Sequence, residues 1–222
     1  MPAEGDGEAR IIPAAAVARL AVYLRVLHDV LADGEERISS EELAEASGAS
    51  STNVRKDLSY LGSHGTRGVG YEVLPLSRRL ETALGLTQEW RVAIVGAGNL
   101  GRALARYHGF QSRGFELVAL LDSDQLVVGQ EVGWLRVADS RNLEAVLRRA
   151  RVNMAVLALP ASAAQDVCDR VVSAGVRSIL NFAPIHLQVP DEVHVRKVDM
   201  ATELQILAYH SQRPPEAGAS SA

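Results

Sequence analysis

Residues 91–101 read RVAIVGAGNLG, and this stretch decides the fold of the second half of the chain. Its first five residues form an apolar run typical of a buried strand, and Gly96, Gly98 and Gly101 follow at the spacing GxGxxG. In a turn that binds a dinucleotide, the first glycine allows a tight bend, the second lets the backbone approach a pyrophosphate, and the third lets the helix pack close to the sheet. The phosphates then lie on free N–H groups at the helix start. The stretch therefore predicts a strand, a phosphate-binding turn and a helix that runs toward Tyr107.

An acidic residue follows at the distance that this kind of turn needs. Asp122 comes 21 residues after Gly101 and ends a second apolar run, 115–121. An acid about 20 residues beyond the glycines bonds the ribose hydroxyls. Ser123 and Asp124 follow with no adjacent arginine to accept a 2′-phosphate, so NAD(H) is favoured over NADP(H). The residues predicted to hold it are Gly96, Ala97, Gly98, Asn99, Leu100, Gly101 and Asp122. The alternative is a Rossmann-like turn that has lost its ligand.

The rest of the second half alternates strands with helices. We expect strands at 91–95, 115–121, 152–159 and 176–180, a strand-like segment at 195–198, and helices at 142–150, 161–174 and 200–213. Such alternation with near-continuous apolar strands predicts an α/β fold with a parallel sheet covered on both faces. The helix between the second and third strands is expected to be short or missing, because residues 126–137 are rich in valine and glycine. This predicts a trimmed Rossmann domain over 88–199 and a separate C-terminal helix over 200–213.

The first half predicts a winged helix over residues 11–86. A helix is expected over 13–31, where apolar residues recur every three or four positions. Ser39 and Glu42 form a capping box that begins a short helix, and after a turn a second helix is expected over 52–61. The glycine-rich segment 62–73 predicts a hairpin, followed by a helix over 75–84.

Basic side chains lie on the second helix of this helix-turn-helix. Arg55 and Lys56 would lie in the major groove of DNA, and Arg67, at the tip of the hairpin, suits a narrow minor groove. The alternative is a set of solvated surface charges, which the nearly balanced charge of this half would favour by itself. The order of motifs favours DNA binding, and the residues predicted to contact DNA are Ser51, Asn53, Arg55, Lys56, Ser59, Tyr60, Arg67 and Gly68.

Composition narrows the class of protein. The chain has 222 residues, a formal net charge of −4 and one cysteine, Cys168, which excludes an internal disulfide and reads as a small buried hydrophobe. No apolar run approaches the roughly 20 residues that span a bilayer, and the polar first residues do not resemble a signal peptide. The six histidines show no metal-ligand spacing. We therefore expect a soluble cytoplasmic protein without membrane or metal, whose ends at 1–10 and 214–222 are disordered.

Several motifs together resemble the Rex family of redox-sensing transcriptional repressors, over about 12–213. They are RLAVYLR at 19–25, VRKDLSY at 54–60, GTRGVGY at 65–71, the GxGxxG turn, NFAP at 181–184 and VD at 198–199. The resemblance implies a homodimer that binds an inverted-repeat operator when NADH is low and leaves it when NADH binds. It also implies that the C-terminal helices are exchanged between subunits.

The resemblance also implies roles for single residues. Lys56 would read a base, Arg55 and Tyr60 would contact phosphate, and Arg67 the minor groove. Asp199 of one subunit would bond Arg25 and Tyr107 of the other in the DNA-competent state.

A dry pocket for the nicotinamide, lined by Phe182, Ala183, Pro184 and Met200, completes the implied cofactor site. Pro160 and Asn181 are also among its predicted cofactor-binding residues. Three positions depart from the family pattern. Ala14 stands where a glutamate is common, His64 stands where the wing often has a tyrosine, and Met200 stands where some members have a bulky residue.

Two other classes of protein remain open at this point. One is a small NAD-dependent dehydrogenase with a helical N-terminal extension. Against it, the chain lacks a second substrate domain, and its only lysines, Lys56 and Lys197, form no recognisable proton relay. The other is a dimeric scaffold that binds no ligand.

Overall fold

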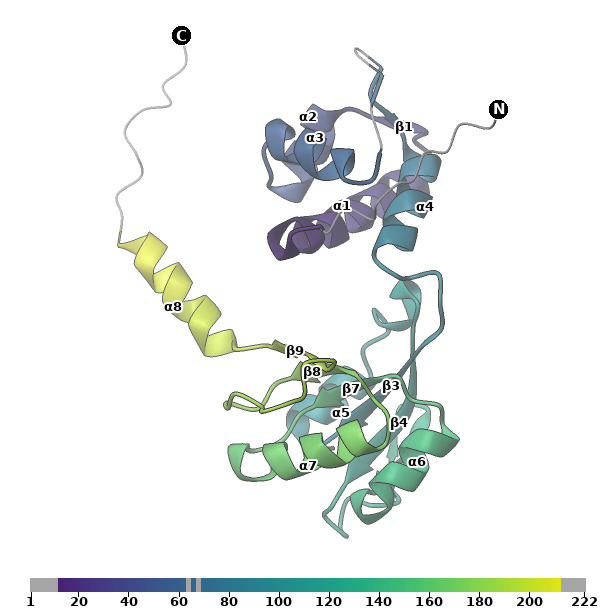
Figure 1. Ribbon diagram of the computed structural model, residues 1–222, viewed down its shortest axis with the longest axis vertical. Coiled ribbons are helices and arrows are strands. Elements are labelled where there is room, and N and C mark those ends of the chain that lie inside the picture. The colour runs from purple at the N-terminus through teal and green to yellow at the C-terminus, as the bar shows by residue number, and fades with distance from the viewer. Residues whose placement is uncertain (1–11, 63–64, 67–68, 213–222) are drawn as a thin grey trace. The chain divides into compact units, whose positions relative to one another are not determined.

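The computed structural model describes residues 12–62, 65–66 and 69–212 (Figure 1). The chain divides into two compact units, Met1–Gln88 and Glu89–Ala222. The termini expected to be disordered, together with His64, Arg67 and Gly68, lie outside the described residues.

The N-terminal unit is helical and contains the predicted helix-turn-helix. Its elements are α1 (Ala14–Ala32), β1 (Arg37–Ile38), α2 (Ser40–Ser47), α3 (Ser51–Ser59), β2 (Tyr71–Glu72) and α4 (Val73–Ala83). The predicted capping box is confirmed, because the Ser39 hydroxyl accepts the Glu42 N–H at 3.1 Å and the Glu42 carboxylate accepts the Ser39 N–H at 2.7 Å. Gly48, with a φ of 68°, ends α2, and Ser50 caps α3.

Three expectations for this unit were wrong in detail. Helix α3 ends at Ser59, two residues before the predicted end. Helix α4 begins at Val73, with Pro75 inside its first turn, where the proline removes no helical hydrogen bond. The segment 62–73 does not pair only with itself: β2 pairs antiparallel with β1, while Thr66 and Gly70 form a single bridge. Strand β1 was missed because two residues carry too little pattern to predict a strand.

The C-terminal unit is a seven-stranded sheet with the order β5-β6-β4-β3-β7-β8-β9. All neighbouring strands pair in parallel except β5 with β6. The strands are β3 (Trp90–Val95), β4 (Phe115–Asp122), β5 (Glu131–Val132), β6 (Leu135–Asp139), β7 (Met154–Leu157), β8 (Ser178–Asn181) and β9 (His194–Lys197). The order reverses between β3 and β7, and in such sheets ligands bind outside the carboxyl ends of the strands at this point.

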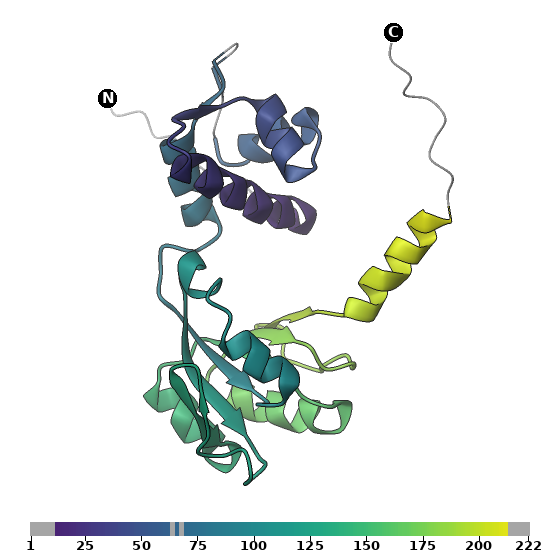
Figure 2. The same ribbon diagram turned by 180° about the vertical axis from the view of Figure 1, so that it is seen from behind.

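Helices cover both faces of the sheet, as predicted. Helices α6 (Leu143–Arg149) and α7 (Ala161–Ser173) cover one face, and α5 (Asn99–Ala105) covers the other (Figures 1 and 2). Strand β3 alternates between the two cores, because Ala93 and Val95 pack on the α6–α7 side while Val92 and Ile94 pack on the α5 side. Cys168 is fully buried in α7, where burial raises its thiol pKa to about 11, so its prediction as a small buried hydrophobe is confirmed.

The helix predicted over 142–150 is α6, but the helix expected to be short or missing over 126–137 is absent from the described residues between β4 and β6. A hairpin of β5 and β6 takes its place, and β6 pairs in parallel with β4, so that Asp139 lies opposite Asp122. The sequence analysis predicted neither strand. This hairpin adds the residues that follow β6 to the carboxyl edge of the sheet.

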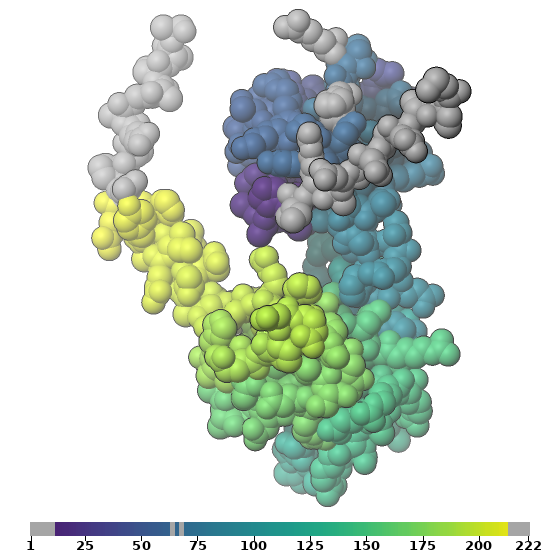
Figure 3. All heavy atoms as spheres, viewed as in Figure 1, coloured from purple at the N-terminus to yellow at the C-terminus, as the bar shows by residue number. Residues whose placement is uncertain are grey.

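The last described element is helix α8 (Met200–Ser211), drawn in yellow in Figure 3. Every residue of α8 is exposed, including Leu204, Ile206, Leu207 and Tyr209. Leu204, Ile206 and Leu207 thus give α8 an exposed apolar surface.

Candidate functional site

The glycine turn after β3 has the backbone geometry of a phosphate-binding turn. Gly96 has a φ of 104°, and a Cβ there would lie 2.2 Å from the Ala158 carbonyl oxygen. A Cβ on Gly101 would lie 1.8 Å from the Gly96 carbonyl oxygen. Gly98, at the start of α5, has nothing within 4 Å of the same position. The protein's own backbone therefore requires two of the glycines, while the third leaves open space where a ligand can approach.

Asp122 is tied to this turn by its side chain. One carboxylate oxygen accepts the Ala97 N–H at 2.6 Å, and the other accepts the Asp124 N–H at 2.9 Å. Each oxygen keeps a second lone pair, which is the acceptor that a ribose hydroxyl needs. The carboxylate is thus fixed beside the glycine turn and remains able to accept two further hydrogen bonds.

The other predicted cofactor residues follow the carboxyl ends of β7, β8 and β9. Pro160 precedes α7, and the buried Asn181 ends β8. The Asn181 side chain accepts the Ala183 N–H at 2.9 Å and donates to the Ile185 carbonyl at 3.1 Å, which shapes the loop that carries Phe182 and Pro184. Ala183 is fully buried in the core, so its side chain does not line an open surface. Met200 begins α8 and is exposed.

The sequence analysis missed three polar residues at this edge: Gln125, Asp139 and Arg141. Asp139 ends β6, and Arg141 follows it in a short 3-10 turn. The Arg141 guanidinium contacts both the Asp139 carboxylate and the Gln125 side-chain oxygen. Gln125 follows Asp122 closely in the sequence, whereas the unpredicted strand β6 brings Asp139 and Arg141 to the same edge. The signal that could have found them is the run LRVAD at 135–139, an apolar stretch that ends in an acid as β4 does.

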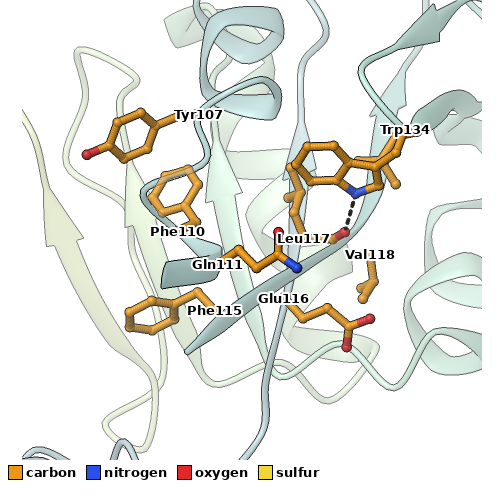
Figure 4. Close-up of a pocket in the computed structure, with 9 residues that line it drawn as sticks. Tyr107, Phe110, Gln111, Phe115, Glu116, Leu117, Val118 and Trp134 are labelled. Atoms are coloured by element: carbon orange, nitrogen blue, oxygen red, sulfur yellow. Dashed lines mark hydrogen bonds between the residues drawn. The ribbon is translucent and has the colours of Figure 1, made fainter. Parts of the chain in front are cut away.

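A separate pocket of about 510 Å³ lies at the amino end of β4, opposite the glycine turn. Figure 4 shows four aromatic residues among its lining, which are Tyr107, Phe110, Phe115 and Trp134. The Trp134 indole donates a hydrogen bond to the Leu117 carbonyl at 3.3 Å. Strand β4 runs from Phe115 to Asp122, so the pocket at Phe115 and the predicted cofactor residues near Asp122 lie at opposite ends of the strand.

Helix α3 presents a mixed polar face. Asn53, Arg55 and Lys56 are exposed, while Ser51, Ser59 and Tyr60 are half-buried. The Arg55 guanidinium is held by the start of α2, at 3.0 Å from the Glu41 carboxylate and 3.1 Å from the Ser40 hydroxyl. Among the residues that the structure describes, no carboxylate pairs with Lys56. Lys56 is therefore the cation on this face that is free to reach a ligand.

The inner face of α3 carries a buried acid. Asp57 is 1% exposed and accepts two hydrogen bonds from the Arg19 guanidinium, at 2.7 and 2.8 Å, and one from the Tyr23 hydroxyl at 3.1 Å. Burial and the bond to Asp57 raise the Tyr23 pKa to about 12, so the phenol stays a donor. This cluster fixes the rotation of α3 on α1 and so decides which residues face outward.

The three residues implied to couple the subunits lie in different units. Arg25 is exposed on α1 of the N-terminal unit. Tyr107 lies in the C-terminal unit, where its hydroxyl accepts from Arg113 at 3.4 Å. Asp199 caps α8 and pairs with Lys197 at 3.2 Å, which lowers the Asp199 pKa together with the backbone N–H bonds. The contacts between subunits that are implied for Arg25, Tyr107 and Asp199 stay a prediction.

The described part of the chain contains no group of three or more His, Cys, Asp or Glu residues that could hold a metal ion. None of its helices has the length and apolar character needed to cross a bilayer.

A helix-turn-helix unit joined to a dinucleotide-binding unit defines a class: transcription regulators that respond to a nucleotide. Each of the two units matches a protein-family model. Residues 11–59 match the family model "Putative DNA-binding protein N-terminus", and residues 87–185 match the model "CoA binding domain".

Curated relatives identify the family. The chain is 55% identical over 204 residues to the redox-sensing transcriptional repressor Rex of Streptomyces avermitilis, covering 92% of this chain and 81% of that one. It is 45% identical over 202 residues to the Rex of Carboxydothermus hydrogenoformans, covering 91% and 97% of the two chains. The chain belongs to the Rex family of redox-sensing transcriptional repressors. Its relatives are repressors rather than dehydrogenases, so the enzyme alternative is not supported.

Solved structures give the same result. The Rex-family repressor RSP in complex with β-NAD⁺ and operator DNA superposes with a TM-score of 0.84 at 36% identity, covering 90% of this chain and 93% of that one. The complex of RSP with β-NADH gives a TM-score of 0.81 at 35% identity, with coverage of 90% and 94%.

Proposed function

We propose that this chain is a homodimeric repressor that binds an inverted-repeat operator when NADH is low and leaves it when NADH binds. The observation that carries the proposal is the pair of RSP complexes, one with β-NAD⁺ and operator DNA and one with β-NADH. The same order of units is found here, with DNA binding assigned to 11–86, NAD(H) binding to 88–199 and a C-terminal helix to 200–213. A repressor acts where the chromosome is, and this supports a cytoplasmic location as part of the proposal.

The cofactor site of this proposal is the carboxyl edge of the sheet. The pyrophosphate would lie over Gly98, where a side chain is absent and space is open. The ribose would bond the Asp122 carboxylate. The nicotinamide would lie against the loop that holds Pro160, Phe182 and Pro184, and against Met200. The backbone of residues 96–101 and the buried Asn181 would hold this site in shape.

The DNA site is assigned to the outer face of α3. Lys56 would donate to a base edge, because it is exposed and carries no ion pair among the described residues. Arg55 would contact phosphate while it remains beside Glu41, with Tyr60, Ser51, Asn53 and Ser59 near it. Arg67 and Gly68 stay assigned to the minor groove on the sequence pattern.

The exchange of the C-terminal helix is part of the proposal, and the exposed apolar face of α8 supports it. Leu204, Ile206, Leu207 and Tyr209 expose about half or more of their surface within one chain. A second subunit that covers this helix would remove the exposed patch. Asp199, which caps α8, would then lie where it can bond Arg25 and Tyr107 of the partner subunit.

A charge difference lets such a dimer tell NADH from NAD⁺. The oxidised nicotinamide carries one positive charge that the reduced ring lacks, and an apolar pocket penalises that charge by desolvation. A ligand shifts a two-state dimer only by its differential affinity for the two states. A change from about 1% to 99% released requires about 5.5 kcal/mol of such difference.

The test is operator binding by fluorescence anisotropy with a labelled inverted-repeat duplex of the family type. One salt concentration is used throughout, because affinity for DNA depends on salt. We expect tight binding that micromolar NADH abolishes and that the same concentration of NAD⁺ preserves. Binding that neither nucleotide changes, or no binding in any state, would contradict the proposal.

A further inference from the structure

The fold brings an arginine, Arg141, to the carboxyl edge of the sheet, where the ribose is proposed to bind. No arginine follows Asp122 directly, but β6 pairs with β4 so that Asp139 lies opposite Asp122. Neighbouring strands are about 4.8 Å apart. Arg141, two residues beyond Asp139, therefore lies at the same edge as Asp122. An arginine at this place is the group that accommodates a 2′-phosphate in NADP-binding Rossmann folds.

The Arg141 guanidinium is already bonded to two neighbouring side chains, Asp139 and Gln125. Its Nε lies 3.1 and 2.9 Å from the two Asp139 carboxylate oxygens, and its Nη2 lies 2.5 Å from one of them. The same Nη2 donates to the Gln125 side-chain oxygen at 2.9 Å. Gln125 in turn donates to the Asp139 carboxylate at 3.3 Å and to the Ser123 carbonyl at 3.2 Å. The contacts link the loop after Asp122 to the end of β6.

The carboxylate in this pair is more firmly held than the guanidinium. The Asp139 side chain is 16% exposed and also accepts the Arg141 backbone N–H at 2.9 Å, whereas the Arg141 side chain is 71% exposed. The Nε–Nη2 edge is the fork that arginine uses for bidentate contact with carboxylate or phosphate. Here Asp139 holds that edge and neutralises its charge.

We propose that Asp139 is a specificity-determining residue, which holds Arg141 away from a 2′-phosphate and so makes the site select NAD(H) over NADP(H). The inference deepens the proposed function and rests on it. Asp122 alone would repel a 2′-phosphate, and the Asp139–Arg141 pair neutralises the arginine that follows β6 at this edge of the sheet.

The deciding variant is Asp139→Asn, measured by titration of the full chain with NADH and NADPH, using energy transfer from tryptophan to the reduced nicotinamide. Asparagine keeps an acceptor for the Arg141 N–H, so the turn after β6 is preserved. We expect NADPH to bind about tenfold more tightly than in the wild type, with NADH affinity changed less than about threefold, because a released guanidinium adds a charge-assisted hydrogen bond. The double variant Asp139→Asn/Arg141→Ala should lose the gain.

A matched control lies on the same hairpin. Arg136 pairs with Glu131 at 3.6 Å at the amino end of β6, far from the carboxyl edge. Glu131→Gln should leave both affinities unchanged. If wild type binds NADH and Asp139→Asn leaves the NADH-to-NADPH ratio unchanged, or if wild type binds both equally, the inference is wrong while the proposed function stands. If wild type binds neither nucleotide, both are wrong.

Discussion

The outer face of α3 and the carboxyl edge of the sheet are both proposed binding surfaces, but one is formed by side chains and the other mainly by backbone. The edge is mainly backbone: at Gly96 and Gly101 any side chain would collide with a carbonyl oxygen of the protein itself. The face of α3 is made of side chains such as Asn53, Arg55 and Lys56, held in direction by one buried cluster. Substitutions at Gly96 and Gly101 should therefore lower the stability of the fold, whereas those on the outer face of α3 should mainly lower the affinity for DNA.

The largest effect is expected from Gly101→Ala, which tests the backbone half of this comparison. Its Cβ would lie 1.8 Å from the Gly96 carbonyl oxygen, so α5 must move off the sheet. We expect the free energy of unfolding to fall by about 3 kcal/mol or more, measured by denaturant unfolding. Gly98→Ala is the matched control, because its position is open, and it should keep the stability within about 1 kcal/mol while weakening NADH binding. An equal loss of unfolding free energy in both variants would show that the clash with the Gly96 carbonyl oxygen is not the cause of the destabilisation.

The next effect concerns the cluster that holds α3. Arg19→Ala leaves the Asp57 carboxylate, which is 1% exposed, without its cation, and we expect a loss of roughly 3 kcal/mol in unfolding free energy. Asp57→Ala should cost less, because Arg19 keeps 35% of its side chain exposed and remains hydrated. His28→Ala is the control, since the His28–Glu81 pair is exposed and should change stability by less than about 1 kcal/mol. A larger loss for Asp57→Ala than for Arg19→Ala would contradict the assignment.

A smaller effect, on operator affinity alone, is expected at Lys56 on the outer face of α3. Lys56→Ala should weaken operator binding by about 1–3 kcal/mol in the anisotropy assay, without changing unfolding or NADH binding. Arg149→Ala removes an exposed cation from α6 of the other unit and should leave operator affinity unchanged. An equal loss in both variants would mean that overall charge, rather than the α3 face, sets the affinity.

The smallest effect is a pH dependence within the sheet unit, away from both surfaces. The Arg170 guanidinium, 2.6 and 2.8 Å from the Glu144 carboxylate, lowers the Glu144 pKa from 4.5 to about 2. A carboxylate with a lowered folded pKa stabilises the protein above its unfolded pKa and loses that contribution as the pH falls. Thermal unfolding should therefore show a shallower loss of stability between about pH 4.5 and 2 in Glu144→Gln than in the wild type. The same slope in both proteins would refute this contribution.

The parts predicted from sequence are those encoded by local patterns. The run 91–101 fixes a strand, a turn and a helix because glycine geometry and apolar periodicity act over a few residues. The capping box at Ser39 and Glu42 is local in the same way. Strands β1 and β5 have two residues each and carry no such signal, and the missed hairpin also hid the place of Arg141 beside Asp122. The Asp57–Arg19 bond joins residues far apart in the chain, so only packing reveals it.

The buried thiol of Cys168 determines how the protein responds to oxidants. Peroxide attacks thiolates, and a fully buried sulfur whose pKa is raised to about 11 offers almost none at neutral pH. The chain has no second cysteine with which to form a disulfide. Oxidative stress therefore has no cysteine trigger here, and the protein can follow the balance of a metabolic electron carrier while oxidant levels rise and fall around that thiol.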